Sequence, residues 1–148
     1  MRKIIALLAL CMCMTVLCAC NPTTIMVPVP PDTLPEQVNS TVASLLAASR
    51  NQDASTVLQL RVFGDGRVRT VDEIADALER NHDFWNYVRW TLTGAATSAS
   101  APGRVWTVTV ELAYDDGHRL PVDIWLARRE DRWVVTAVPV PPVLFAQD

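Results

Sequence analysis

The sequence predicts an α+β domain in which helices from the first half of the chain cover one face of a four-stranded antiparallel sheet. Three observations support this prediction. Apolar residues recur at helical spacing before residue 80, four Val-, Thr- and Trp-rich segments separated by turn signals follow, and one hairpin places its large aliphatic side chains on a single face. With 148 residues, half of them hydrophobic, the chain is long enough for one domain with its own core.

The first expected helix covers residues 35–50. Its apolar positions from Val38 to Ser49 share one face, and Thr33 with Glu36 matches a capping box at its start. Asp53 can then cap a shorter element over residues 54–61, which fits either a helix or a strand, with the helix preferred.

Another helix is expected after the Gly-Asp-Gly turn at residues 64–66. Thr70 and Glu73 form a second capping box, and the apolar stripe behind them ends near Asn81 and His82. This helix completes the expected helical layer.

The second half of the chain is rich in strand-forming residues. The expected strands cover residues 85–93, 104–114, 119–128 and 132–138. The last of these is apolar on both faces, which predicts an interior position in the sheet. Val88, Trp90 and Leu92 are expected to extend the apolar face of the two middle strands.

The hydrophobic pattern also chooses the register of the middle hairpin. A turn with Gly117 as its left-handed residue pairs Tyr114 with His118. Two apolar rows then share the face that meets the helices: Trp106, Val108, Val110 and Leu112 on one strand, and Leu120, Val122, Ile124 and Leu126 on the other. The alternative two-residue turn would shift the pairing by one residue and mix these faces.

The N-terminus carries the marks of an export signal. Arg2 and Lys3 precede an uncharged apolar run of residues 4–17, which is too short for a membrane-spanning helix but suits a signal peptide. The next residues, Leu17-Cys18-Ala19-Cys20, resemble the lipobox of bacterial lipoproteins. The resemblance implies cleavage before Cys20, lipid attachment to its sulfur, and anchorage to a membrane of the bacterial cell envelope.

These features divide the chain into four parts. A signal peptide covers residues 1–19, the lipidated cysteine and a Pro-rich spacer cover 20–35, the α+β domain covers 36–140, and a tail covers 141–148. Asn21 follows the cysteine where an aspartate would retain an enteric-type lipoprotein in the inner membrane. The lipobox resemblance therefore favours the periplasmic side of an outer membrane, if the cell has one, and otherwise the outer surface of the cytoplasmic membrane.

The domain pattern is similar to the nuclear transport factor two-like superfamily, which includes the SnoaL-like proteins. The matching stretches are the turn at residues 50–53, the helix at 67–78, the strand at 106–112 and the closing strand at 130–135. The resemblance implies a curved, cone-like sheet covered by N-terminal helices. Enzymes of this superfamily use Asp, His or Tyr inside the cone, and no matching constellation occurs here.

Charge and motifs exclude several function classes. A net charge of −3 does not suit a nucleic-acid binder. No metal-ligand spacing or phosphate-binding loop occurs, so neither a metal nor a cofactor is expected. Every basic residue after Cys20 is Arg or His, which is more typical of genomic base composition than of a phosphate site. The two best-defined strands place no ionisable residue on the face towards the helices, which argues against an enzyme.

Two groups of residues remain as candidate sites. His82, Asp83, Phe84 and Trp85 fall where the mouth of a cone would lie. His82 and Asp83 fit a catalytic dyad only if both point inward; otherwise they are a histidine at a helix end beside a loop aspartate. The second group is Trp125 with Thr107, Thr109 and Asp123 on the opposite face of the sheet, which suits a protein interface unless the C-terminal tail covers it.

The sequence therefore predicts a lipid-anchored, non-enzymatic envelope protein whose domain binds a protein, a second copy of itself or a small apolar ligand. A structural component of an envelope or secretion assembly is one alternative. A cone-pocket enzyme is the other.

Overall fold

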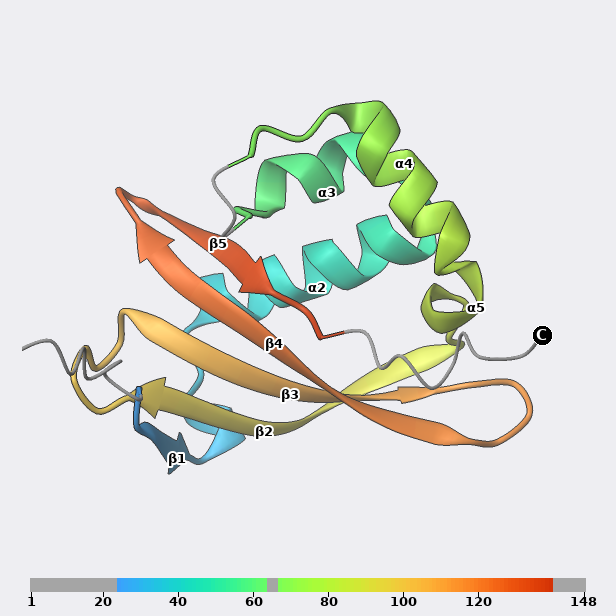
Figure 1. The fold of residues 1–148 in the computed structure, drawn as a ribbon. Helices are drawn as coiled ribbons and strands as arrows, with labels where there is room; N and C mark the ends of the chain where they lie inside the picture. Colours follow the sequence, from blue (N-terminus) through green and yellow to red (C-terminus); the bar gives the residue numbers. More distant parts are fainter. Residues whose placement is uncertain (1–23, 64–66, 140–148) are drawn as a thin grey trace, which may run out of the picture.

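The computed structural model describes residues 24–63 and 67–139. The predicted signal peptide, Cys20 and the tail at 141–148 lie outside the described residues. Figure 1 shows one twisted sheet with the α-helices of the described residues on one side of it. The α+β class and the helical layer on one face are therefore confirmed.

The sheet has five antiparallel strands in the order β1-β2-β3-β4-β5, one more than predicted. They are β1 (Met26–Val29), β2 (Arg89–Ser98), β3 (Val105–Ala113), β4 (Arg119–Arg129) and β5 (Arg132–Ala137).

The additional strand comes from the Pro-rich segment that the sequence predicts as a spacer. β1 pairs with the end of β2, with Met26 opposite Ser98, and the amide of Ala99 donates to the carbonyl of Ile25. Proline suits an edge strand because its missing N–H can face away from the ladder. The segment is therefore extended, as predicted, but it forms the edge strand of the sheet next to β2.

The predicted capping box at Thr33 is wrong. Residues Pro31–Thr33 form a short 3₁₀ helix, η1, and the hydroxyl of Thr33 donates to the carbonyl of Pro30 at 2.7 Å. The N-cap of the following helix is Pro35, which makes no side-chain capping bond.

The helical layer contains α2 (Glu36–Arg50), α3 (Ala54–Leu60), α4 (Val71–Arg80) and the single turn α5 (His82–Trp85). Asp53 caps α3 by accepting from the amide of Thr56 at 3.1 Å. The capping box of α4 is complete, because Thr70 accepts from the amide of Glu73 while Glu73 accepts from that of Thr70. These predictions are confirmed.

The predicted register of the β3–β4 hairpin is also confirmed. Leu112 lies opposite Leu120 and Val108 opposite Ile124. Gly117 has φ +88°, and the amide of Tyr114 donates to the carbonyl of His118. The apolar side chains of this face pack against α2, where Val38, Val42 and Leu46 are fully buried.

β2 starts and ends later than predicted. Residues 84 and 85 belong to α5, and Val88 is half exposed at 49%, so its expected place on the apolar face is wrong. A bulge follows Leu92, and Gly94 lies opposite Thr109, where a Cβ would come within 3.3 Å of the threonine Cβ. Bulges bend strands, and this one lets β2 continue to Ser98.

β5 lies at the edge of the sheet, so its predicted interior position is wrong. Its apolar residues are nevertheless buried: Trp133, Val134 and Val135 are all at most 9% exposed. Part of its free edge is occupied by the chain after α3, since the amide of Val62 donates to the carbonyl of Val135 at 2.9 Å. The apolar pattern that predicted a central strand reflects the burial of both faces of β5.

Candidate functional site

A pocket of about 420 Å³ opens among the four α-helices and the segment that follows β5. The apolar residues that line it are Leu45, Val57, Phe63, Ile74, Ala77, Leu78, Trp85 and Val138. This volume lies within the usual range of small-molecule sites, roughly 300–1,000 Å³. The pocket is the principal candidate for a functional site among the described residues.

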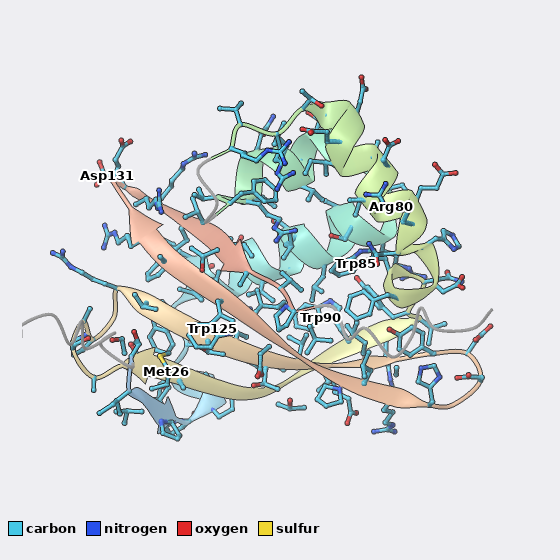
Figure 2. The ribbon with its side chains drawn as sticks, viewed as in Figure 1. Met26, Arg80, Trp85, Trp90, Trp125 and Asp131 are labelled. Carbon is cyan, nitrogen blue, oxygen red and sulfur yellow. The ribbon has the colours of Figure 1, made fainter. Side chains whose placement is uncertain are left out.

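α5 supplies one of the two aromatic residues that line the pocket; the other is Phe63, from the chain after α3. The turn places Trp85 in the pocket lining at 5% exposure, while Phe84 is completely buried beside it. The two rings meet edge to face with centroids 4.5 Å apart. Figure 2 shows Trp85 between the end of α4 and the sheet, below Arg80.

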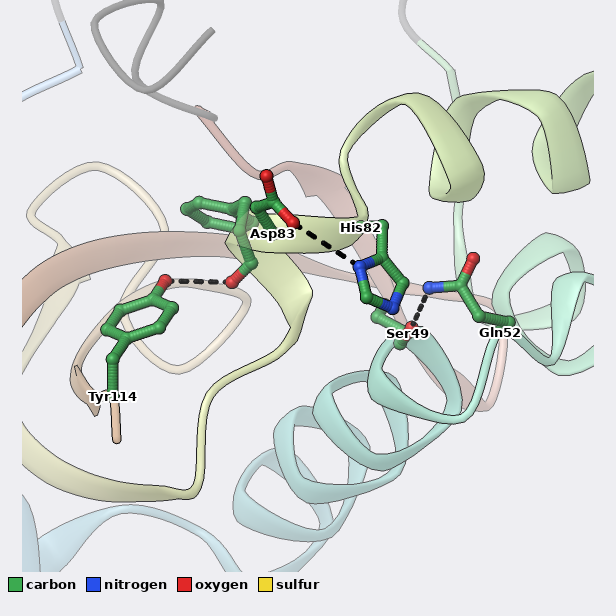
Figure 3. A network of polar contacts seen from close by, with 6 residues as sticks. Ser49, Gln52, His82, Asp83 and Tyr114 are labelled. Carbon is green, nitrogen blue, oxygen red and sulfur yellow. Dashed lines mark hydrogen bonds and ion pairs between the residues drawn. The ribbon is translucent and has the colours of Figure 1, made fainter. Parts of the chain in front are cut away.

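The position of α5 is fixed by Tyr114, from the end of β3. Its hydroxyl donates a buried hydrogen bond of 2.8 Å to the carbonyl of Phe84 (Figure 3). Its ring stacks on that of His118 at 4.2 Å. Burial, the negative charge of Asp116 and the neighbouring Tyr87 raise the pKa of Tyr114 to about 12.

The charged part of the lining comes from the chain between α3 and α4. Arg61 and Arg69 both approach the ring of Phe63, with guanidinium carbons 4.9 and 5.3 Å from its centroid. Arg61 is mostly buried, and burial together with the nearby charge of Arg69 lowers the pKa of its guanidinium.

α4 contributes both signs of charge to the rim. Arg80 and Asp76 are exposed side chains on the lining. Glu73 also lines the pocket, but its carboxylate accepts from the amide of Thr70 and lies 3.7 Å from the guanidinium of Arg67. The carboxylate of Glu73 therefore already has partners at the start of α4, namely the amide of Thr70 and the guanidinium of Arg67.

The four residues expected at the mouth separate in the structure. Trp85 lines the pocket and Phe84 lies in the core behind it. The side chains of His82 and Asp83 are 59% and 96% exposed and touch only weakly, at 3.4 Å (Figure 3). Neither of these two residues lines the pocket.

The four residues expected at an interface do come together on the other face of the sheet. Thr107 lies opposite Trp125, and Thr109 lies opposite Asp123. The hydroxyl of Thr109 donates to the carboxylate of Asp123 at 2.6 Å. Trp125 is half-buried and Thr107 is 9% exposed, so the accessible part of this patch is small.

Sequence reasoning missed the arginines of the pocket. The arginine content was interpreted as compositional, whereas Arg61, Arg69 and Arg80 come from the helical layer and line the pocket. A usable signal was the alternation Arg61-Val-Phe63, because an arginine directly after a helix and two residues before an aromatic ring can stack on that ring.

Among residues 24–63 and 67–139, no group of three His, Cys, Asp or Glu side chains could hold a metal ion. No helix in that part of the chain is both long and apolar enough to cross a membrane.

Comparison with solved structures identifies the fold. A proposed NTF2-like (nuclear transport factor two-like) transpeptidase from Campylobacter jejuni aligns with a TM-score of 0.50 at 10% identity, over 67% of this chain and 97% of that one. An NTF2-like protein of unknown function from Shewanella oneidensis MR-1 aligns at 0.45 and 16% identity, over 68% and 93%. The domain thus has an NTF2-like fold, as the sequence resemblance predicted. No protein-family model matches the chain, and the comparison with curated proteins found no match.

Proposed function

We propose that this domain is a non-enzymatic binding module that holds a small, largely apolar ligand in the pocket beneath α4. The observation that supports the proposal is the pocket itself: about 420 Å³, with an apolar wall built from four helices. Two local contacts position the wall: Tyr114 holds α5 by a hydrogen bond to Phe84, and the capping box starts α4 at a defined residue.

The arrangement of polar groups favours binding over catalysis. His82 and Asp83 face solvent instead of the pocket, and they were the pair on which an enzyme mechanism depended. The residues on the pocket lining that carry charge are arginines and carboxylates near the rim, which are suited to orienting a ligand.

We further propose that the domain acts at a membrane of the bacterial cell envelope, anchored by lipid on Cys20. This proposal rests on the sequence of the first twenty residues. Its test is metabolic labelling with a clickable fatty acid in a bacterial host. The label should appear in the wild-type chain and disappear in Cys20→Ser, and equal labelling of both chains would overturn the anchor.

The pocket is tested by filling it. Ala77 lines the pocket, whereas Ala75 on the same helix is exposed. Isothermal titration of the full chain with 4-phenylbutan-1-ol and octan-1-ol should give saturable binding. Ala77→Phe should weaken it at least about tenfold by occupying ligand space, and Ala75→Phe should leave it unchanged. Absence of binding, or equal binding by both variants, would contradict the proposed function.

A further inference from the structure

The charges around the pocket indicate the class of ligand that it selects. We propose that the pocket binds a monocarboxylate amphiphile, with the carboxylate paired to Arg61 and the apolar body against Leu45, Ile74 and Trp85. This inference rests on the proposed binding function and adds the chemistry of the head group.

Arg61 is held in place by its backbone. Its amide donates to the carbonyl of Val57 at the end of α3, and the next amide, that of Val62, donates to Val135 on β5. The side chain therefore starts from a fixed point between the helical layer and the sheet. Such preorganisation reduces the entropy lost when a ligand binds.

The guanidinium of Arg61 has one nitrogen, Nε, that is buried and has no hydrogen-bond partner among the described residues. The terminal nitrogens are therefore the ones left to contact a ligand in the pocket. The Phe63 ring contacts the cation, but stacking uses the flat face of a guanidinium and leaves its N–H edge for hydrogen bonds. Carboxylates bind to this edge through two parallel hydrogen bonds.

The rest of the lining favours an anionic head group. Among the described lining residues, Arg61, Arg69 and Arg80 outnumber the acids Glu73 and Asp76, and Glu73 is already paired with Arg67 and with the amide of Thr70. A carboxylate is attracted to this excess of positive charge.

The apolar wall determines the remainder of the ligand. Leu45, Ile74 and Trp85 are each at most 5% exposed and line the same pocket as Arg61. A small polar acid such as acetate would leave this surface without a partner. An alkyl or aryl chain attached to the carboxylate removes it from water, and the gain grows with each methylene buried.

The test compares matched acids and alcohols on the purified full chain by isothermal titration near neutral pH. The acids 4-phenylbutyrate and octanoate differ from 4-phenylbutan-1-ol and octan-1-ol in the head group alone. We expect the acids to bind at least about tenfold more tightly, because a hydrogen bond to a charged group is stronger than a neutral one. Arg61→Gln should remove that advantage, so that the ratio of acid affinity to alcohol affinity falls to about one.

Arg89→Gln is the matched control, since it removes the same charge from an exposed position at the start of β2 and outside the pocket. Arg89→Gln should change neither the affinity for the acids nor the affinity for the alcohols. If Arg61→Gln does not fold, Arg61→Lys keeps the charge without the two-pronged donor, and the acid advantage should fall by about threefold or more.

The outcomes separate this inference from the proposed function. Equal affinity for acids and alcohols, or an acid advantage that survives loss of Arg61, would overturn the carboxylate site while leaving ligand binding intact. Failure of both series to bind would overturn the binding function as well.

Discussion

Replacing Tyr114 with phenylalanine removes one oxygen atom from the contact that holds α5, and with it Trp85, against the sheet. The lost interaction is a buried 2.8 Å hydrogen bond to the carbonyl of Phe84. Leaving a buried acceptor without its donor costs about 1–3 kcal/mol. For a domain of this size, 1 kcal/mol corresponds to roughly 4 °C in Tm, so Tyr114→Phe should melt about 4–12 °C lower.

The same tyrosine predicts a pH dependence. Its folded-state pKa is raised from 10.0 to about 12, chiefly by burial. The unfolded chain therefore ionises Tyr114 first as pH rises, which stabilises the unfolded state. The contribution of the neutral phenol is fully present below pH 10 and is lost as pH rises through about 12. The difference in unfolding free energy between wild type and Tyr114→Phe should therefore become smaller as the pH rises from 10 to about 12.

The assay is urea denaturation of both chains at several pH values from neutral to strongly alkaline. Tyr87→Phe is the control, because its ring is equally buried but no hydrogen bond of its hydroxyl is seen among the described residues. It should cost less than about 0.5 kcal/mol. A Tyr114→Phe cost no larger than that of the control, or a cost that is constant with pH, would refute the reasoning.

Two further predictions concern α4 and the outer face of the sheet. Thr70→Ala removes one half of the capping box and should cost about 1 kcal/mol by denaturant unfolding. Thr41→Ala removes only a hydroxyl that donates to the carbonyl of Gln37 within α2, and it should cost much less. Equal costs would mean that the box does not stabilise α4. If Trp125 and Thr107 form a self-association surface, Trp125→Ser should lower the mass measured by light scattering to that of a monomer. A wild-type chain that is already monomeric would refute self-association at this surface.

The elements that could be predicted from sequence are those fixed by local chemistry. Gly117 supplies the left-handed residue of the β3–β4 turn, and the alternation of apolar residues on both strands then leaves one register. Asp53 and Thr70 mark helix starts because their side chains accept from amides three residues ahead.

The elements that were missed depend on distant partners. The Pro-rich run around Pro28 is extended both in isolation and in an edge strand, and only its pairing with Ala96, far along the chain, distinguishes these states. Phe84 and Trp85 have high strand propensity, but packing in the core and the bond from Tyr114 hold them in a helical turn.

Only the part of the candidate site that depends on local sequence could be predicted. Trp85 was expected near a pocket from its position after a helix, and it does line the pocket. The spacing of Arg61 and Phe63 indicates a stacked pair, but the position of Arg61 in the pocket depends on the pairing of the chain after α3 with β5, a contact over more than seventy residues.

The measurement that tests the central claim most directly is the indole N–H spectrum of the full chain during titration with 4-phenylbutyrate. The chain has five tryptophans, and Trp85→Phe identifies the signal of the one that lines the pocket. We predict a saturable shift of the Trp85 signal that is larger than that of Trp125, and its loss in Ala77→Phe. A Trp85 signal that does not move, or that moves equally in Ala77→Phe, would contradict ligand binding in this pocket.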